Sequence, residues 1–197
     1  MRDRRAERRE ATRAEIVAAA WEVVGENGIG ALSLRDVAER VGMRPPSLYE
    51  YFDSKNAIYD ALFADGQRML YDALTEDKDL DPLEQMRART HDFIDFCVQN
   101  PARTQLLFVR TIPGFEPSPE SYALAVRTLT AVNEAFADLG VDDPSAVDLY
   151  TAMISGLVNQ QLANEPGGKR WVVLADEMLD MLLDHLRKTG RLTEGEP

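Results

Sequence analysis

The chain has 197 residues, of which 45% are hydrophobic and 28% charged, a composition typical of one large or two small globular domains. A single cysteine excludes an internal disulfide, so we expect a reducing, cytoplasmic setting. No apolar run approaches the roughly 20 residues of a membrane-spanning helix, and the arginine-rich N-terminus lacks the apolar segment of a signal peptide.

The net charge of −12 is distributed unevenly along the chain. Residues 1–55 carry 10 Lys and Arg against 10 Asp and Glu, whereas residues 56–197 carry 12 against 24. Six of the arginines fall within residues 1–13. An acidic body with a neutral-to-basic end would direct that end toward a phosphate backbone, although an acidic surface also simply keeps a protein in solution.

The first nine residues, MRDRRAERR, have no apolar period, and we expect a mobile arm there. Such an arm can reach phosphates or a minor groove; the alternative is a solvated tail without a partner. A helix over Arg9–Asn27 follows and ends at Gly28 and Gly30. Its buried stripe is formed by Ile16, Ala20, Val23 and Val24.

The stretch Ser33–Phe52 predicts two short helices joined by a tight turn. Ser33 and Asp36 form a capping-box pattern at the start of the first of these helices. Gly42 stands where a residue of positive φ is needed to end that helix. Pro45 and Pro46 then suit the first turn of the second helix. This is the helix-turn-helix pattern, whose second helix enters the DNA major groove.

Two longer runs resemble a known family. The run GMRPPSLYEYFDSKNAIYDAL is similar to the recognition-helix signature of TetR-type transcriptional regulators, and EIVAAAWEVVGENGIGALSLRDVAERVG to their first two helices. The resemblance implies an all-α fold of nine helices, with a three-helix DNA-binding head. We therefore expect a helix-turn-helix DNA-binding domain over residues 1–55 and a ligand-binding and dimerisation domain over residues 56–197.

Periodicity and breaker residues predict the remaining helices, and no stretch predicts a strand convincingly. Prolines and glycines separate the helical segments and mark the loops between them. The expected helices cover, approximately, residues 53–73, 82–99, 102–111, 120–139, 142–162 and 171–188.

Seven residues are candidates for contact with DNA. The resemblance implies that Tyr49 and Lys55 hold phosphates, through a hydroxyl and a point charge. Arg44 begins the recognition helix, where an arginine can make a bidentate contact to guanine. The alternatives are a packed Tyr49 and surface ion pairs for the arginines, for example between Arg35 and Glu39. The complete set is Arg35, Arg44, Pro45, Ser47, Tyr49, Tyr51 and Lys55.

The last two helices are candidates for a homodimer interface, because one helix-turn-helix reads few bases and dimers bind paired half-sites. The family resemblance favours a four-helix interface, whereas an apolar stripe can equally be buried inside one chain. The residues expected on the two faces are Ile154, Leu157, Val158, Gln161, Met178, Met181, Leu182 and His185.

The family resemblance also implies an effector site between the fifth and eighth helices. A small apolar molecule there would tilt the fourth helix and shift the two recognition helices. The alternative is that the same side chains simply form the core. The candidate residues are Phe93, Phe96, Cys97, Leu107, Phe108, Met153 and Leu157.

Enzymatic activity is not expected, because the chain has neither a Gly-rich phosphate loop nor a Gly-x-Ser-x-Gly elbow. His91 and Asp95 could form half a metal site, but a solvated helix face explains that spacing better, and we expect no metal and no cofactor. The sequence therefore predicts a DNA-binding regulator, most simply a ligand-released repressor acting on a palindromic operator. An all-helical interaction adaptor is the alternative.

Overall fold

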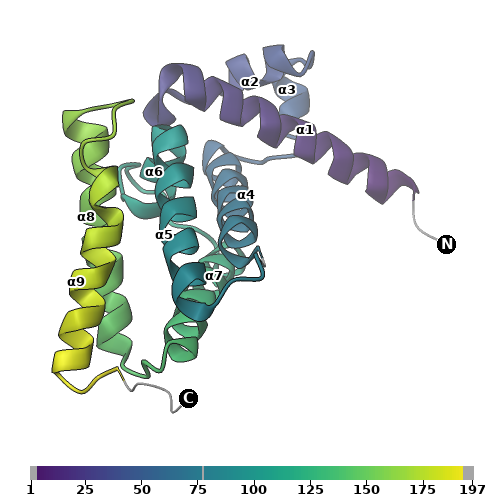
Figure 1. Ribbon diagram of the computed structural model, residues 1–197. Helices are drawn as coiled ribbons and strands as arrows, with labels where there is room; N and C mark the ends of the chain where they lie inside the picture. Colours follow the sequence, from purple (N-terminus) through teal and green to yellow (C-terminus); the bar gives the residue numbers. More distant parts are fainter. Residues whose placement is uncertain (1–3, 77, 193–197) are drawn as a thin grey trace. The chain divides into compact units, whose positions relative to one another are not determined.

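The computed structural model describes residues 4–76 and 78–192, and in these residues all regular secondary structure is helical, with nine α-helices and no strand (Figure 1). The predicted all-α class is thereby confirmed. The α-helices are α1 (Arg4–Asn27), α2 (Leu34–Arg40), α3 (Pro45–Leu48), α4 (Lys55–Thr75), α5 (Pro82–Gln99), α6 (Pro101–Phe108), α7 (Pro119–Asp138), α8 (Pro144–Asn164) and α9 (Ala175–Lys188). Two 3-10 helices, η1 (Ile29–Ala31) and η2 (Val172–Leu174), precede α2 and α9.

The packing divides the chain into two compact units. The head unit lies within residues 1–67 and 102–124, and the body unit within residues 68–101 and 125–197. The boundaries therefore fall inside α4 and α7 and directly after Pro101, the first residue of α6. Accordingly, α6 and the first residues of α7 pack with the N-terminal segment, although they are far from it in sequence.

The N-terminal segment differs from the expected arm, because α1 begins at Arg4; residues 1–3 lie outside the described part. Arginine, alanine and glutamate all favour helix, and Glu7 places a negative charge in the first turn, where the helix dipole favours it. Local propensity therefore extends α1 over residues that lack any apolar period.

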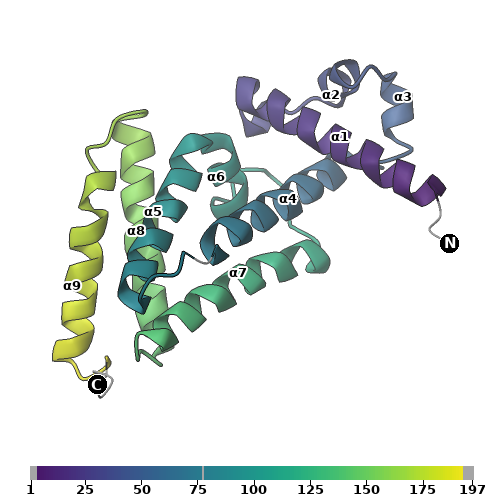
Figure 2. The ribbon, with the colours of Figure 1, turned by 45° about the vertical axis from the view of Figure 1, so that its right-hand side comes forward.

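The predicted helix-turn-helix is confirmed (Figure 2), and its second helix ends at Leu48, so Tyr49 and Tyr51 follow the helix. The Ser33 hydroxyl accepts a hydrogen bond from the Asp36 amide at 3.4 Å and caps α2. Gly42 has φ +68° and ends the helix, as only a residue without a Cβ does readily. Pro45 opens α3, and the side chain of Leu48 is completely buried.

Carboxylate caps begin two helices of the body unit. Asp81 accepts from the amides of Leu83 and Glu84 at the start of α5, and Asp143 from the amide of Ser145 at the start of α8. These caps satisfy backbone donors that the first turn of a helix leaves unpaired. They explain why both starts could be predicted from sequence.

A buried polar pair lies in the core between α5 and α8. Thr90 donates its hydroxyl hydrogen to the Met86 carbonyl, so Tyr150 donates to Thr90 across 3.0 Å. Phe136 of α7 contacts the Tyr150 ring with centroids 5.3 Å apart. Burial raises the pKa of Tyr150 to about 12, which keeps the phenol protonated as this donor role requires.

Gln161 closes the connection from α8 to α9 and is 1% exposed. Its amide nitrogen donates to the Glu165 carbonyl, and its oxygen accepts from the amides of Trp171 at 2.9 Å and Val172 at 3.4 Å. One side chain thus bonds the end of α8 and the start of η2. The 3-10 helix η2 stands where the sequence predicted the first turn of the last helix.

None of the described helices combines the length and hydropathy that crossing a lipid bilayer requires.

Candidate nucleic-acid interface

The surface of α3 carries several of the predicted contact residues. Arg44 is the N-cap residue of α3, and its exposed side chain caps no backbone group. Pro45 is exposed, Ser47 is half-buried, and Tyr49 is 55% exposed. Because Leu48 lies on the opposite, buried side, these four residues occupy the solvent side of a short helix fixed by its core contact.

Tyr51 and Lys55 are less free than the sequence suggested. Both are half-buried. The guanidinium of Arg9 lies 5.6 Å from the Tyr51 ring centroid, and the Lys55 ammonium lies 5.4 Å from that of Tyr59. Each therefore has an intramolecular cation–π partner, and neither simply projects from the head.

Arg35 is exposed on α2, and among the described residues it makes no ion pair with Glu39. The basic residue that pairs is Arg40, whose guanidinium lies 3.2 Å from Glu22 and 2.7 Å from Glu26 on α1. The hydrogen bond from Arg40 holds the pKa of Glu26 below its ordinary value. Arg40 thus ties α2 to α1, while Arg35 stays available to solvent.

Arg9 and Arg13 were not among the predicted site residues, yet both contact the end of the helix-turn-helix. Arg9 donates to the Glu50 carbonyl at 2.8 Å, and Arg13 donates to the Tyr51 carbonyl. Their i, i+4 spacing on α1 places them on one face. The i, i+4 spacing could have indicated a shared helix face in the sequence. It was not used because residues 1–9 were expected to form a mobile arm and not a helix.

The first half of α4 is anchored to the helices of the head. Tyr59 donates its hydroxyl to the Ile29 carbonyl at 2.8 Å, and the Trp21 indole donates to Asp65 at 2.8 Å. Asp60 accepts from the Ser118 amide and hydroxyl and from the Ser121 hydroxyl, at 2.7 to 2.9 Å. The start of α7 is thereby fixed to α4 within the head unit.

The predicted effector residues are distributed over both units. Phe93, Phe96, Cys97, Met153 and Leu157 belong to the body unit, and Leu107 and Phe108 to the head unit. Cys97 is completely buried and Phe96 is 7% exposed, whereas Phe108 is 42% exposed. Leu107 packs closely on α4, since a Cβ at Gly66 would lie 3.1 Å from its side chain. Neither unit alone assembles the whole set.

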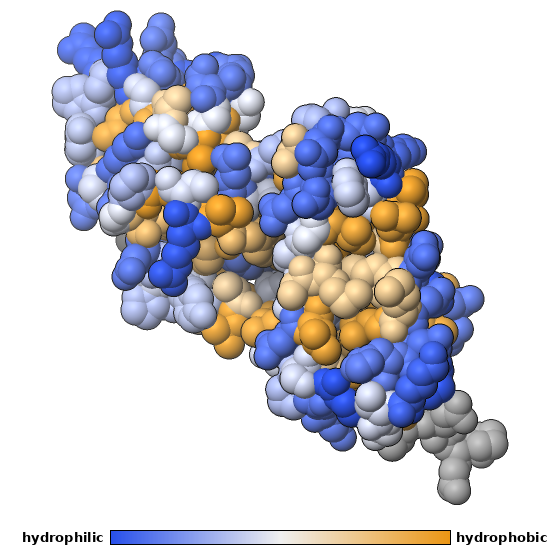
Figure 3. Space-filling model, turned by 90° about the vertical axis from the view of Figure 1, so that its left-hand side faces the viewer, coloured by the Kyte–Doolittle hydropathy of each residue, from blue (hydrophilic) through white to orange (hydrophobic). Residues whose placement is uncertain are grey.

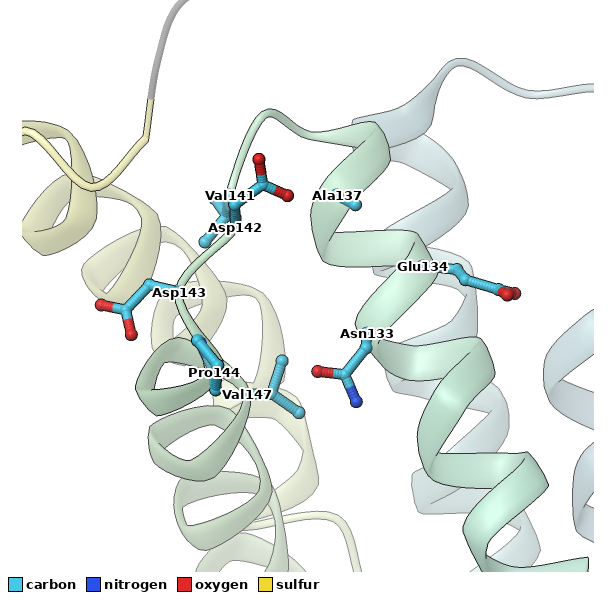
Figure 4. Close-up of a pocket in the computed structure, with 8 residues that line it drawn as sticks. All are labelled: Asn133, Glu134, Ala137, Val141, Asp142, Asp143, Pro144 and Val147. Atoms are coloured by element: carbon cyan, nitrogen blue, oxygen red, sulfur yellow. The ribbon is translucent and has the colours of Figure 1, made fainter.

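A pocket of about 250 Å³ lies where α7 meets α8 in the body unit (Figure 4). None of the predicted effector residues lines it. Asp143 at its edge already caps α8 and accepts a hydrogen bond from Arg191. The hydrogen bonds from Ser145 are the main cause that lowers the pKa of Asp143, and the Arg191 contact adds to them. The lining residues are Asn133, Glu134, Ala137, Val141, Asp142, Asp143, Pro144 and Val147.

No group of residues suited to hold a metal ion occurs in the described ranges. His91 does not pair with Asp95 as considered above; its Nε2 lies 3.1 Å from Asp176 of α9. Arg87 pairs with Asp176 and Asp180 on the same side, and the hydrogen bond to Asp180 raises its pKa. These contacts join α5 to α9.

The faces expected to form a dimer interface prove to be mostly interior. Ile154, Val158, Gln161, Met178 and Leu182 are at most 6% exposed within the single chain, so that part of the expectation is wrong. They are buried because α8 and α9 pack on each other and on α5.

Other apolar residues form the outer surface of α8 and α9. Figure 3 looks onto this side, where apolar side chains gather between hydrophilic ends. Met181 is the one predicted apolar face residue that stays largely exposed, at 62%. The exposed large apolar residues of α8, η2 and α9 are Leu149, Val173, Leu174 and Met181; Ala152 and Gly156 are exposed beside them.

Residues 16–62 match the family model described as bacterial regulatory proteins, tetR family. The chain is also similar to the HTH-type transcriptional regulator Rv1816 of Mycobacterium tuberculosis, with 29% identity over 140 residues, which are 68% of this chain and 59% of that protein. The chain spans between 48% and 59% of the length of the first curated relatives that it matches.

Two solved structures extend the likeness over most of the chain. The TetR transcriptional regulator SCO0520 of Streptomyces coelicolor is 27% identical with a TM-score of 0.54, covering 92% of this chain and 99% of that one. BioQ, solved with its double-stranded DNA operator, is 20% identical with a TM-score of 0.60, covering 88% and 98%. At that identity, BioQ shows a common fold alone.

Proposed function

Because the chain belongs to the TetR family of bacterial regulatory proteins, we propose that it binds double-stranded operator DNA as a homodimer and regulates transcription. The observation that carries this proposal is the solvent side of α3. It combines an exposed arginine, an exposed tyrosine and a half-buried serine on a helix that is fixed from behind by Leu48. BioQ, with the same fold, was solved on its operator.

We assign the contacts by chemistry. Arg44 suits a guanine edge, with Pro45 and Ser47 beside it for a thymine methyl and a polar base group. Tyr49, Tyr51, Lys55 and Arg35 suit phosphates, which position a protein without reading sequence. The cation–π contacts of Tyr51 and Lys55 leave the Tyr51 hydroxyl and the Lys55 N–H groups able to donate.

The small size of α3, which has four residues, supports the proposed dimer, because one such helix reads too few bases alone. Two copies placed about 34–36 Å apart would read successive major grooves on one side of the duplex. The outer surface of α8 and α9 is the proposed interface, with Met181 and the exposed small residues Ala152 and Gly156 allowing close approach.

Release by a small apolar effector is the remaining part of the proposal. Its candidates are still the seven residues named from sequence, of which Phe93, Met153 and Leu157 are half-buried in the body unit. A molecule that binds only the released conformation shifts the equilibrium away from DNA. Such a molecule makes the protein a repressor that is induced by its ligand.

A binding assay against salt concentration separates this function from that of an interaction adaptor. Fluorescently labelled duplex from the region upstream of the gene is titrated at several salt concentrations. A DNA-binding regulator gives log K falling steeply with log salt, because phosphate contacts release counterions. Absence of duplex binding at low salt would instead favour the adaptor, whose partners are proteins.

The Arg44→Ala variant is expected to lose discrimination at one base position of each half-site. A bidentate arginine–guanine contact is worth roughly 1–3 kcal/mol of discrimination. The measurement compares wild-type and variant affinities over duplexes substituted one position at a time. Arg35→Ala, which removes a charge proposed to contact phosphate, serves as the control and should weaken all duplexes alike. Uniform weakening by Arg44→Ala would make Arg44 a phosphate contact as well.

A further inference from the structure

We propose that Arg9 and Arg13 are positioning residues for operator recognition, holding the end of the recognition segment (residues 44–52) without contacting DNA themselves. This inference rests on the proposed DNA-binding function. It assigns the basic character of α1 to an intramolecular clamp, in place of the phosphate-seeking arm that the sequence suggested.

The recognition segment ends with carbonyl groups that have no helical partner. The amides of Tyr51 and Phe52 both donate to the Leu48 carbonyl at 3.0 Å, and the helical turn stops there. The carbonyls of Glu50 and Tyr51 therefore lack the donors four residues on that a longer helix supplies. Arg9 and Arg13 donate to these two carbonyls.

Each arginine makes a second contact with the same segment. The Arg13 guanidinium carbon lies 4.3 Å from the Phe52 ring centroid, and that of Arg9 lies 5.6 Å from the Tyr51 centroid. A planar guanidinium can stack on a ring and donate in its plane at the same time, which a lysine ammonium cannot. Arginine at positions 9 and 13 can therefore stack on an aromatic ring and donate to a backbone carbonyl at the same time.

The clamp acts on the far end of the segment whose first residues, Arg44, Pro45 and Ser47, would meet the base edges. Leu48 anchors the middle of the segment in the core, while Arg9 and Arg13 fix its end, so Tyr49 lies between two fixed points. A major-groove contact depends on the orientation of a short helix relative to the rest of the head. Loosening one end should therefore reduce sequence-specific binding more than general attraction to the backbone.

The test uses the full-length protein with the Arg13→Lys, Arg13→Ala, Arg9→Ala and Arg8→Ala variants. Arg8 is exposed on the same helix, so Arg8→Ala removes the same charge without touching the clamp. Affinities for the operator duplex and an unrelated duplex are measured at several salt concentrations. Hydrogen exchange of the amides of residues 49–54 is measured without DNA.

Arg13→Lys, which keeps the charge, is expected to weaken operator binding about tenfold, as loss of one charge-assisted hydrogen bond predicts. Its salt slope and its affinity for the unrelated duplex should stay at wild-type values. Hydrogen exchange within residues 49–54 should accelerate in Arg13→Lys and Arg9→Ala and stay unchanged in Arg8→Ala. If Arg13→Ala does not fold, Arg13→Lys and Arg9→Ala still decide the result.

Two results would overturn the proposal. Unchanged exchange in Arg13→Lys and Arg9→Ala would show that no clamp exists, whatever happens on DNA. A salt slope reduced by about one in Arg9→Ala, with equal weakening on both duplexes, would make Arg9 a phosphate contact. Failure of the wild-type protein to bind any duplex would instead refute the proposed function, and the exchange data would still report on the clamp.

Discussion

The Met181→Glu variant is expected to be monomeric and to bind the operator at least 100-fold more weakly than the wild type. Met181 is 62% exposed in the single chain, so the substitution should not disturb the monomer. In the proposed dimer it would place an unpaired carboxylate in an apolar interface, which is strongly unfavourable. Because two linked half-site contacts gain roughly 10²–10⁴ in affinity over one, the loss on DNA should be of that order.

Sedimentation at micromolar concentration measures the mass of the variant, and operator titration measures its affinity. Val126→Glu is the matched control, since Val126 is 48% exposed on α7 and receives the same charge. It should remain dimeric and bind the operator normally. A dimeric Met181→Glu protein would place the interface elsewhere, and a monomeric wild type would refute the dimer itself.

The Gln161→Ala variant is expected to be less stable by about 2–4 kcal/mol, because truncation of this buried side chain removes three hydrogen bonds and leaves the half-buried amides of Trp171 and Val172 without their acceptor. The buried Gln161 side chain accepts hydrogen bonds from the amides of Trp171 and Val172 and donates one to the Glu165 carbonyl. For a chain of this length the melting temperature should fall by roughly 6–12 °C. Thermal and urea unfolding followed by circular dichroism give both quantities.

Gln160→Ala provides the comparison for this variant. Gln160 is the neighbouring amide and is exposed to solvent; within the described part of the chain, its side chain accepts a hydrogen bond from Asn164 one turn on and makes no other. Its truncation should change the unfolding free energy by less than about 0.5 kcal/mol. Equal effects of the two substitutions would mean that the α8–η2 connection does not depend on the Gln161 hydrogen bonds.

The sequence by itself determined the helices and the helix-turn-helix, because the signals that begin and end a helix act over a few residues. The Ser33 cap, the turn at Gly42 and the Asp81 and Asp143 caps each depend on hydrogen bonds or dihedral angles within about one turn. Such local signals are legible without any knowledge of the neighbours in space. The solvent side of α3 followed equally, from the inward positions of Leu48 and Phe52.

Only the tertiary structure decided which apolar or polar side chains of α8 and α9 face outward. Periodicity identifies a stripe but not its partner, so Ile154 and Gln161 were expected on the surface and are buried against other helices. The i, i+4 spacing of Arg9 and Arg13 indicates a shared helix face, but it does not identify the carbonyls some 40 residues away that the two arginines contact. Long-range packing is the physical reason in each case, because the partner of a side chain is set by the chain's fold and not by its own neighbours in sequence.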